Sequence, residues 1–195
     1  MILKDRKNTF VPNVKSVSLS YMRANPDYFG EALVLCEQFG ICDIISFNIA
    51  FDADLLAQFF ATVYFLKRAD RTLTWMCRDE AVSCKWEVFM EALGVPVSTP
   101  DMALGLRPHT MEKARDKSEL APLQNTFLYT DAKGQKKSRL VLIPFLDIMH
   151  RIFRTSLFPR VGNLDQVHSY LVNMLLLCEE YKNTTQTLDV CSIMW

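Results

Sequence analysis

The stretch from Phe51 to Pro96 constrains the fold most, because three apolar segments alternate there with short charged links. Its first segment, FDADLLAQFFATVYF, has apolar residues at helical spacing behind aspartates that can cap a helix. The second, RTLTWMCRDEAVSCKW, is rich in β-forming residues and predicts two antiparallel strands. The third, EVFMEALGVP, predicts a short helix that ends at a glycine and a proline. The stretch therefore predicts a helix, a β-hairpin and a second helix that together anchor an apolar core.

Four details of this stretch can be predicted. Asp52 and Asp54 are both candidate N-caps, since a short carboxylate accepts hydrogen bonds from the free N–H groups of a first helical turn. The link at 78–81 contains no glycine, which favours a four-residue loop over a two-residue primed turn. Gly94 is expected to end the second helix in the left-handed conformation.

The segment before this stretch predicts one helix between two irregular parts. Residues 1–24 are basic and are interpreted as an N-terminal arm, either irregular or forming a short edge strand. Asn25 and Pro26 predict a helix start, because asparagine caps well and proline fits the first helical position. This helix is expected to stop at Gly40, and residues 41–50 to be extended or irregular.

Residues 97–139 have the weakest periodicity and are interpreted as a loop-rich excursion, since prolines and a glycine interrupt them. Within and just after this region, residues 127–129 and 140–143 are predicted to be paired strands around a turn at 131–134. The chain is thus expected to contain one or two small hairpins.

Two longer helices are predicted after this excursion. Pro144 opens the first, and Asn163 caps the second with Gln166 three residues later, a variant capping box. A further helical pattern begins at Asp189 and is cut off at Trp195, which indicates a domain truncated at its C terminus. The predicted fold is a single globular domain over residues 25–195, α+β and predominantly α-helical, with five to seven helices and one or two small antiparallel β-hairpins.

Composition narrows the classes of partner. Half of the 195 residues are hydrophobic, and Lys plus Arg equals Asp plus Glu at 22 each, so no overall charge draws the chain to nucleic acid or membrane. No apolar run reaches the ~18 residues of a membrane span, so no membrane partner is expected. Residues 24–104 carry 5 basic and 12 acidic groups, whereas residues 105–139 carry 8 basic and 4 acidic. A solvated face explains this asymmetry most simply.

The six cysteines do not have the spacing of a zinc site. Because the N terminus turns charged at once and offers no signal-peptide core, we expect reduced thiols and an intracellular location, nuclear or cytoplasmic. Cys36 and Cys178 lie on apolar helix faces, where cysteine is usually a small core residue. Cys77 and Cys84 could face each other across the hairpin.

The histidines, glycine motifs and carboxylates of the sequence indicate no class of enzyme. His150 and His168 fall beside apolar stripes and are interpreted as structural, and no nucleophile or phosphate-binding glycine motif occurs. A transposase or nuclease centre needs carboxylates that converge from strands, and no candidate set stands at predicted strand ends. We therefore predict no catalytic residues, no metal and no cofactors, and rank a transposase or nuclease fragment last.

One cluster hints at function. Lys133, Lys136, Lys137 and Arg139 surround the predicted turn at 131–134, and a basic finger of this kind could neutralise phosphates. These four are the candidate nucleic-acid-binding residues. A solvated hairpin tip is the preferred interpretation. Aromatic stacking residues are not interleaved with the basic ones, which argues against a protein that binds single strands.

The motifs LLAQFFATVYF, RTLTWM and WEVFMEALGV, followed by FPRVGNLDQVHSYLVNMLLLCEE and TLDVCSIMW, resemble the domain of plant transposon proteins that are abundant in grass genomes. The resemblance covers most of residues 40–195. It implies an origin in a mobile element of a plant nuclear genome and no established activity. The leading hypothesis is a non-catalytic structural or protein-interaction domain with a protein partner or self-association. The alternative is a nucleic-acid-binding module acting through the basic hairpin loop.

Overall fold

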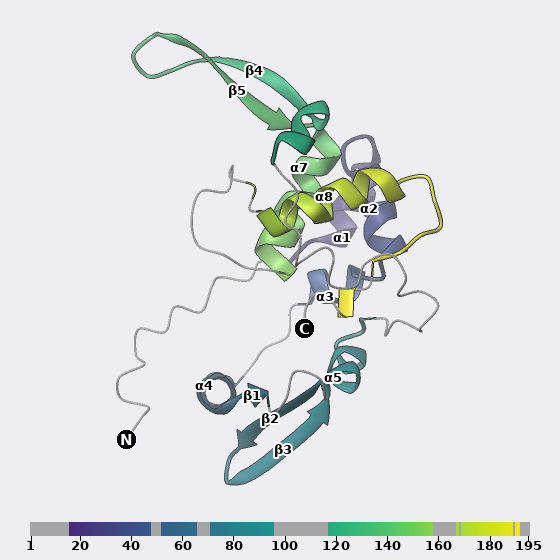
Figure 1. Cartoon of the computed structure of the whole chain (residues 1–195), viewed down its shortest axis with the longest axis vertical. Coiled ribbons are helices and arrows are strands. Elements are labelled where there is room, and N and C mark those ends of the chain that lie inside the picture. Colours follow the sequence, from purple (N-terminus) through teal and green to yellow (C-terminus); the bar gives the residue numbers. More distant parts are fainter. Residues whose placement is uncertain are drawn as a thin grey trace.

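The computed structural model describes residues 16–47, 52–65, 71–95, 117–157, 167, 169–188 and 190–191, and it confirms the predicted α+β, mostly helical class (Figure 1). The α-helices in these residues are α1 (Leu19–Ala24), α2 (Pro26–Gln38), α3 (Cys42–Ser46), α4 (Ala53–Thr62), α5 (Trp86–Ala92), α7 (Pro144–Ile152) and α8 (Ser169–Tyr181). A 3₁₀ helix, η4 (Lys117–Leu123), and a π-helical turn, η5 (Phe153–Leu157), accompany them. The strands are β1 (Tyr64–Phe65), β2 (Thr72–Cys77), β3 (Glu80–Lys85), β4 (Gln124–Thr130) and β5 (Lys136–Leu142).

Helices α2, α7 and α8 form the centre of the core (Figure 1). Proline at the first position starts both α2 and α7, as predicted, because its missing N–H is not needed there. Cys36 of α2 lies 3.9 Å from the sulfur of Met149 of α7, and both side chains are fully buried. The apolar faces predicted for these helices are therefore packed against each other.

The stretch organised around β2 and β3 has the predicted order of helix, hairpin and helix, with β1 added at one edge of the sheet. Asp52 is the N-cap of α4, and its carboxylate accepts hydrogen bonds from the N–H groups of Asp54 and Leu55 at 2.9 and 3.1 Å. Phe59 of α4 packs edge-on against Trp75 of β2, with ring centroids 5.7 Å apart. Gly94 ends α5 with a φ of +73°, as predicted.

The predicted four-residue loop at 78–81 is wrong. Cys77 pairs directly with Glu80, which leaves a two-residue turn in which Arg78 has a φ of +57°. The side chain of Gln58 explains how a non-glycine residue is held there: its amide donates to the carbonyl of Arg78 and accepts from its N–H, both at 2.7 Å. A contact from α4 thus stabilises a turn that local sequence disfavours.

Two segments predicted to be irregular are helical. Residues 19–24, at the end of the predicted arm, form α1. The Ser18 side chain caps this helix, and Met22, which is 3% exposed, packs into the core. Residues 42–46 form α3 where an extended segment was expected, and Ile45 is buried there. Short apolar runs have too few turns for periodicity to distinguish helix from strand, and tertiary burial decides between them.

The register of β2 and β3 also corrects the cysteine prediction. Cys84 lies opposite Leu73, and Cys77 lies opposite Glu80, so the two cysteines do not face each other. The apolar stripe predicted for α4 is only partly buried, because Phe60, one of its residues, is 50% exposed.

Helix α5 and the residues just after it contact the C-terminal part of the chain and α3. The indole N–H of Trp86 donates to the carbonyl oxygen of Cys191 at 2.7 Å, and a Cβ placed on Gly94 would come 3.2 Å from Asp43 of α3. No helix among the described residues is long and apolar enough to cross a membrane. Several predictions fall outside the described residues, namely those for residues 1–15, 97–116, Pro96, His109, Asn163, Gln166, His168, Asp189 and Trp195.

Candidate nucleic-acid interface

The basic cluster lies on the hairpin formed by β4 and β5, which the described residues contact at one end only. At its base, the N–H of Ile143 donates to the carbonyl of Leu123 at 3.0 Å, and Leu142 and Leu120 are buried in the core. From this base toward the tip, most residues of both strands are exposed, and the hairpin projects away from α7 (Figure 1). The predicted strands at 127–129 and 140–143 are thus confirmed as parts of a longer hairpin inside the region interpreted as a loop-rich excursion.

The tip of this hairpin is held by one aspartate. The Asp131 carboxylate accepts hydrogen bonds from the N–H groups of Lys133 and Gln135, each at 2.9 Å. Gly134 adopts a φ of +76°, a conformation that glycine reaches without strain. The turn predicted from sequence is therefore present, and it orders the backbone that carries the basic residues.

Phe127, Tyr129, Lys137 and Arg139 share one face of the hairpin, which we call the aromatic face. The register places Phe127 opposite Arg139 and Tyr129 opposite Lys137, and side chains of directly opposed residues lie on the same side of a sheet. The two rings lie nearly parallel, with centroids 6.4 Å apart and an interplanar angle of 18°. They are 48% and 40% exposed.

The guanidinium of Arg139 lies beside both rings. Its guanidinium carbon lies 5.4 Å from the ring centroid of Phe127 and 5.9 Å from that of Tyr129, within the range of cation–π attraction. The sequence-based argument that aromatic residues are not interleaved with the basic ones is therefore wrong. The alternation of Phe127, Leu128 and Tyr129 carried the signal, but only the cross-strand register shows that Arg139 lies beside both rings.

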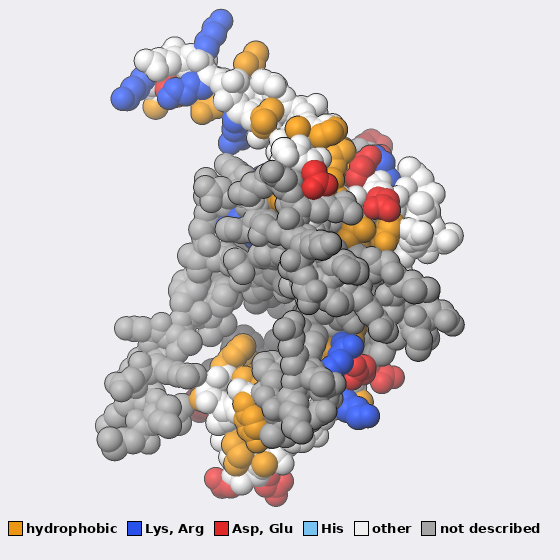
Figure 2. All heavy atoms as spheres, in the orientation of Figure 1, with side chains coloured by type: hydrophobic (Ala, Val, Ile, Leu, Met, Phe, Trp, Pro, Cys, Tyr) orange, Lys and Arg blue, Asp and Glu red, His pale blue; other side chains and the backbone are white. Residues whose placement is uncertain are grey.

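The four basic residues have different surroundings. Lys137 on the aromatic face donates to the Asp131 carboxylate at 2.7 Å, and this hydrogen bond, followed by those from the backbone of Gln135 and Lys133, lowers the pKa of Asp131. Lys133 is exposed at the tip, and the register turns Lys136 to the opposite face. Basic and hydrophobic side chains lie next to each other along the projecting hairpin (Figure 2).

The opposite side of the hairpin, here named the leucine face, carries Leu128, Leu140 and Lys136. Leu128 is 76% exposed and Leu140 is 62% exposed. Leu128 and Leu140 are diagonal neighbours on this face, because the register places Leu128 opposite Ser138. The hairpin therefore presents two chemically distinct faces, one aromatic and cationic and the other aliphatic.

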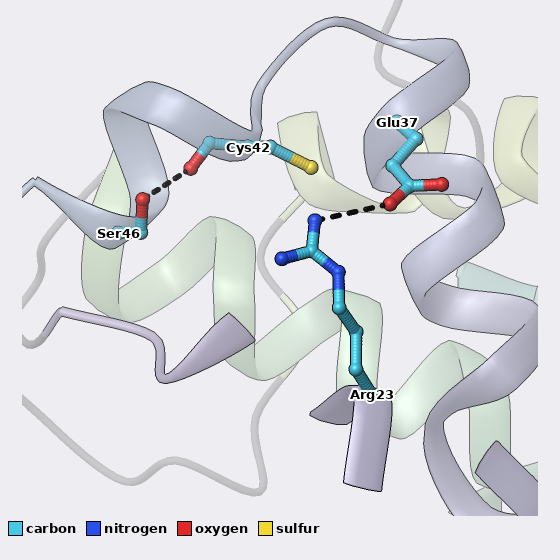
Figure 3. Close-up of polar contacts among 4 residues, drawn as sticks. All are labelled: Arg23, Glu37, Cys42 and Ser46. Atoms are coloured by element: carbon cyan, nitrogen blue, oxygen red, sulfur yellow. Dashed lines mark hydrogen bonds and ion pairs between the residues drawn. The ribbon is translucent and has the colours of Figure 1, made fainter. Parts of the chain in front are cut away.

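The thiols have no such functional arrangement. Burial raises the pKa of Cys36 and Cys178 well above the usual range, so both stay protonated and serve as packing residues, as predicted. Cys42 points toward the guanidinium of Arg23, which pairs with Glu37 at 3.3 Å (Figure 3). Partial burial, and then the charge of Glu37, nevertheless raise the pKa of Cys42, so this thiol is not activated.

No group of three or more His, Cys, Asp or Glu side chains that could hold a metal occurs in the part of the chain that the structure describes. A hollow beside the first turn of α4 is lined by Asp52, Asp54 and Arg78 among others, but Asp52 is already engaged as the N-cap. The described residues therefore offer no cluster of ligands on which the nuclease hypothesis could be built.

Comparisons of the chain with protein-family models, curated proteins and solved structures found no match. The resemblance to plant transposon proteins accordingly stays a prediction, and functional inference depends on the site itself.

Proposed function

We propose that the protein binds single-stranded nucleic acid, without catalysis, through the aromatic face of hairpin β4–β5. The observation that carries this proposal is the pair of exposed rings, Phe127 and Tyr129, joined by Arg139. Every base has a π-face, so exposed aromatic rings and a guanidinium plane provide stacking surfaces for unpaired bases whatever their sequence.

The charge of the hairpin supports the same ligand. Residues 124–142 contain four basic side chains and one acidic, a net charge of +3, on a chain whose total is zero. Phosphates that approach the stacked bases would meet Lys133 at the tip and Lys137 on the aromatic face, whereas Lys136 lies on the opposite face. Since each neutralised phosphate of a single strand releases about 0.7 of a counterion, the affinity should depend on salt.

The test is a fluorescence-anisotropy titration of labelled single-stranded DNA and RNA at several salt concentrations. We expect the double variant Lys133→Gln, Lys137→Gln to bind more weakly and to reduce the salt slope by about 1.4, the contribution of two phosphate contacts. The matched control, Arg23→Gln with Arg151→Gln, removes the same charge from residues that are exposed on α1 and α7.

The control should bind as the parent protein does. Equal losses in both double variants would mean that only net charge matters, and salt-independent binding would contradict phosphate contact altogether. A duplex of the same sequence should bind less tightly than the single strand, because its bases are already stacked.

The second candidate is the leading hypothesis from sequence, a non-catalytic structural or protein-interaction domain of a plant transposon-derived protein. The leucine face favours it, since Leu128 and Leu140 are exposed there. Replacing both by serine should abolish recovery of a protein partner by pulldown, while leaving nucleic-acid binding intact. Loss of nucleic-acid binding in this variant would instead indicate that both faces contact one ligand.

A further inference from the structure

One edge of strand β3 pairs with β2, and the hydrogen-bond pattern shows which backbone groups form its other, outer edge. The N–H of Trp86 donates to the carbonyl of Arg71 at 2.6 Å, which continues the register of β2 and β3 by one pair. Backbone groups of an antiparallel strand face its two neighbours alternately. Residues 80, 82 and 84 therefore bond toward β2, and the N–H and C=O groups of Ala81, Ser83 and Lys85 point the other way.

Among the described residues, no strand pairs with this outer edge. Ala81, Ser83 and Lys85 are all exposed residues. The other edge of the sheet is formed by β1, which has only two residues, so β3 offers the longer row of backbone donors and acceptors. Such an edge is a template for a further strand.

The charges along β3 favour antiparallel pairing with a strand like itself. The turn end carries Arg78, Asp79 and Glu80, a net charge of −1. At the other end Lys85 is positive, while the nearby Arg71 and Glu87 neutralise each other in an ion pair of 2.9 Å. An antiparallel copy brings each negative end to a positive end, whereas a parallel copy would join like charges.

We propose that β3 is a self-association edge, on which β3 of a second copy of this chain pairs antiparallel to form a continuous six-stranded sheet. The register that uses every outward group centres on Ser83, which lies opposite Ser83 of the other copy, and places Ala81 opposite Lys85. Lys85 then lies diagonally across from Asp79 of the other copy, within the reach of a long side chain. This surface is separate from the aromatic and leucine faces, and the inference does not depend on nucleic-acid binding.

The experiment is sedimentation velocity on the full chain over a wide range of concentration. Ser83→Pro removes the outward N–H at the centre of the pairing but no bond to β2, and edge strands tolerate proline. Ser83→Ala is the matched control, because both substitutions lose the hydroxyl contact with Thr74, 2.8 Å long, and only proline loses the N–H. We expect a dimer for the parent and for Ser83→Ala, and a dissociation constant roughly tenfold higher or more for Ser83→Pro.

A second set of variants decides the matter if Ser83→Pro loses its native circular-dichroism spectrum. Asp79→Lys and Lys85→Asp should each weaken the dimer, and the double variant should recover it, because the charges are then exchanged. A parent chain that stays monomeric, a folded Ser83→Pro that dimerises as well as Ser83→Ala, or a double variant no tighter than the single ones would overturn the proposal. So would a dimer that is lost when Leu128 and Leu140 become serine, since that would place the contact on hairpin β4–β5.

Discussion

Hairpin β2–β3 directs its large side chains into the core, whereas hairpin β4–β5 exposes them. On β2, Leu73 is 2% exposed and Trp75 lies under Phe59 of α4. On β4, Phe127 and Leu128 are 48% and 76% exposed. The contrast follows from the neighbours of each hairpin. Helices α4 and α5 flank the first in sequence and cover it, whereas the second is contacted by the rest of the described chain only at its base.

This difference separates residues that stabilise the fold from residues that are available to a ligand. An isolated two-stranded hairpin is marginally stable in water, so large exposed side chains on one add little to folding. The aromatic side chain of β2, Trp75, is accounted for by its packing against Phe59 and Phe89. Phe127 and Tyr129 of β4 are not, and their association with Arg139 supports the proposal that they contact a ligand.

The largest difference in stability is expected between the truncation of a buried leucine and that of an exposed one. Leu146→Ala in α7 should lower the free energy of unfolding by about 2–5 kcal/mol, because it opens a cavity in a fully buried site. Leu140→Ala, on the leucine face, should change it by less than about 0.5 kcal/mol. Urea denaturation measures both, and similar midpoints for the two variants would contradict the assignment of hairpin β4–β5 to the surface.

A comparison of phenylalanines gives the next effect. Phe59→Ser or Phe89→Ser should destabilise by about 2–3 kcal/mol, since each ring packs in the cluster with Trp75. Phe127→Ser should cost less than about 1 kcal/mol, because half of its surface is already in water. Thermal melts followed by circular dichroism test this, and a Phe59→Ser melt identical to that of the parent would break the comparison.

The turns of the two hairpins provide a smaller contrast. Gln58→Ala removes both side-chain hydrogen bonds to Arg78 and should lower stability by about 1–2 kcal/mol, since the turn then keeps its left-handed residue without support. Hairpin β4–β5 has its turn supported from within by Asp131 and needs no helix. Chemical denaturation of Gln58→Ala with an unchanged midpoint would show that the helix contact is not needed.

The smallest effect concerns ligand affinity. Asp131→Asn keeps the oxygen that orders the tip but removes the charge that holds Lys137, so single-stranded nucleic acid should bind about two- to fivefold more tightly. The carboxylate is charged at neutral pH, because its pKa is lowered by the hydrogen bond from Lys137 and by those from the backbone of Gln135 and Lys133. Anisotropy titrations at low salt would detect the change, and weaker binding would mean that Asp131 itself contacts the ligand.

The sequence predicted those elements whose local signals agree with their packing. Pro26 and Pro144 mark helix starts, Asp52 is a cap and Gly94 is a helix end, because each meets a requirement of backbone geometry that does not depend on distant residues. Arg78 was mispredicted for the opposite reason, since its conformation depends on Gln58, twenty residues away.

The candidate site was only half predictable. The basic residues of the tip were visible as a charge cluster, but their relation to the aromatic rings depends on cross-strand register. The loop from Asp131 to Gln135 sets that register and brings Arg139 beside Phe127, whereas a shift of one residue would have put them on opposite faces.

The most direct test of the central claim compares the two faces of hairpin β4–β5 in single-stranded nucleic-acid binding. We predict that Phe127→Ala with Tyr129→Ala lowers the affinity by roughly tenfold or more, since each stacked base contributes about 1–3 kcal/mol. The matched pair Leu128→Ala with Leu140→Ala should leave it unchanged. Equal affinities for both double variants and the parent, measured by anisotropy on folded protein, would contradict the account.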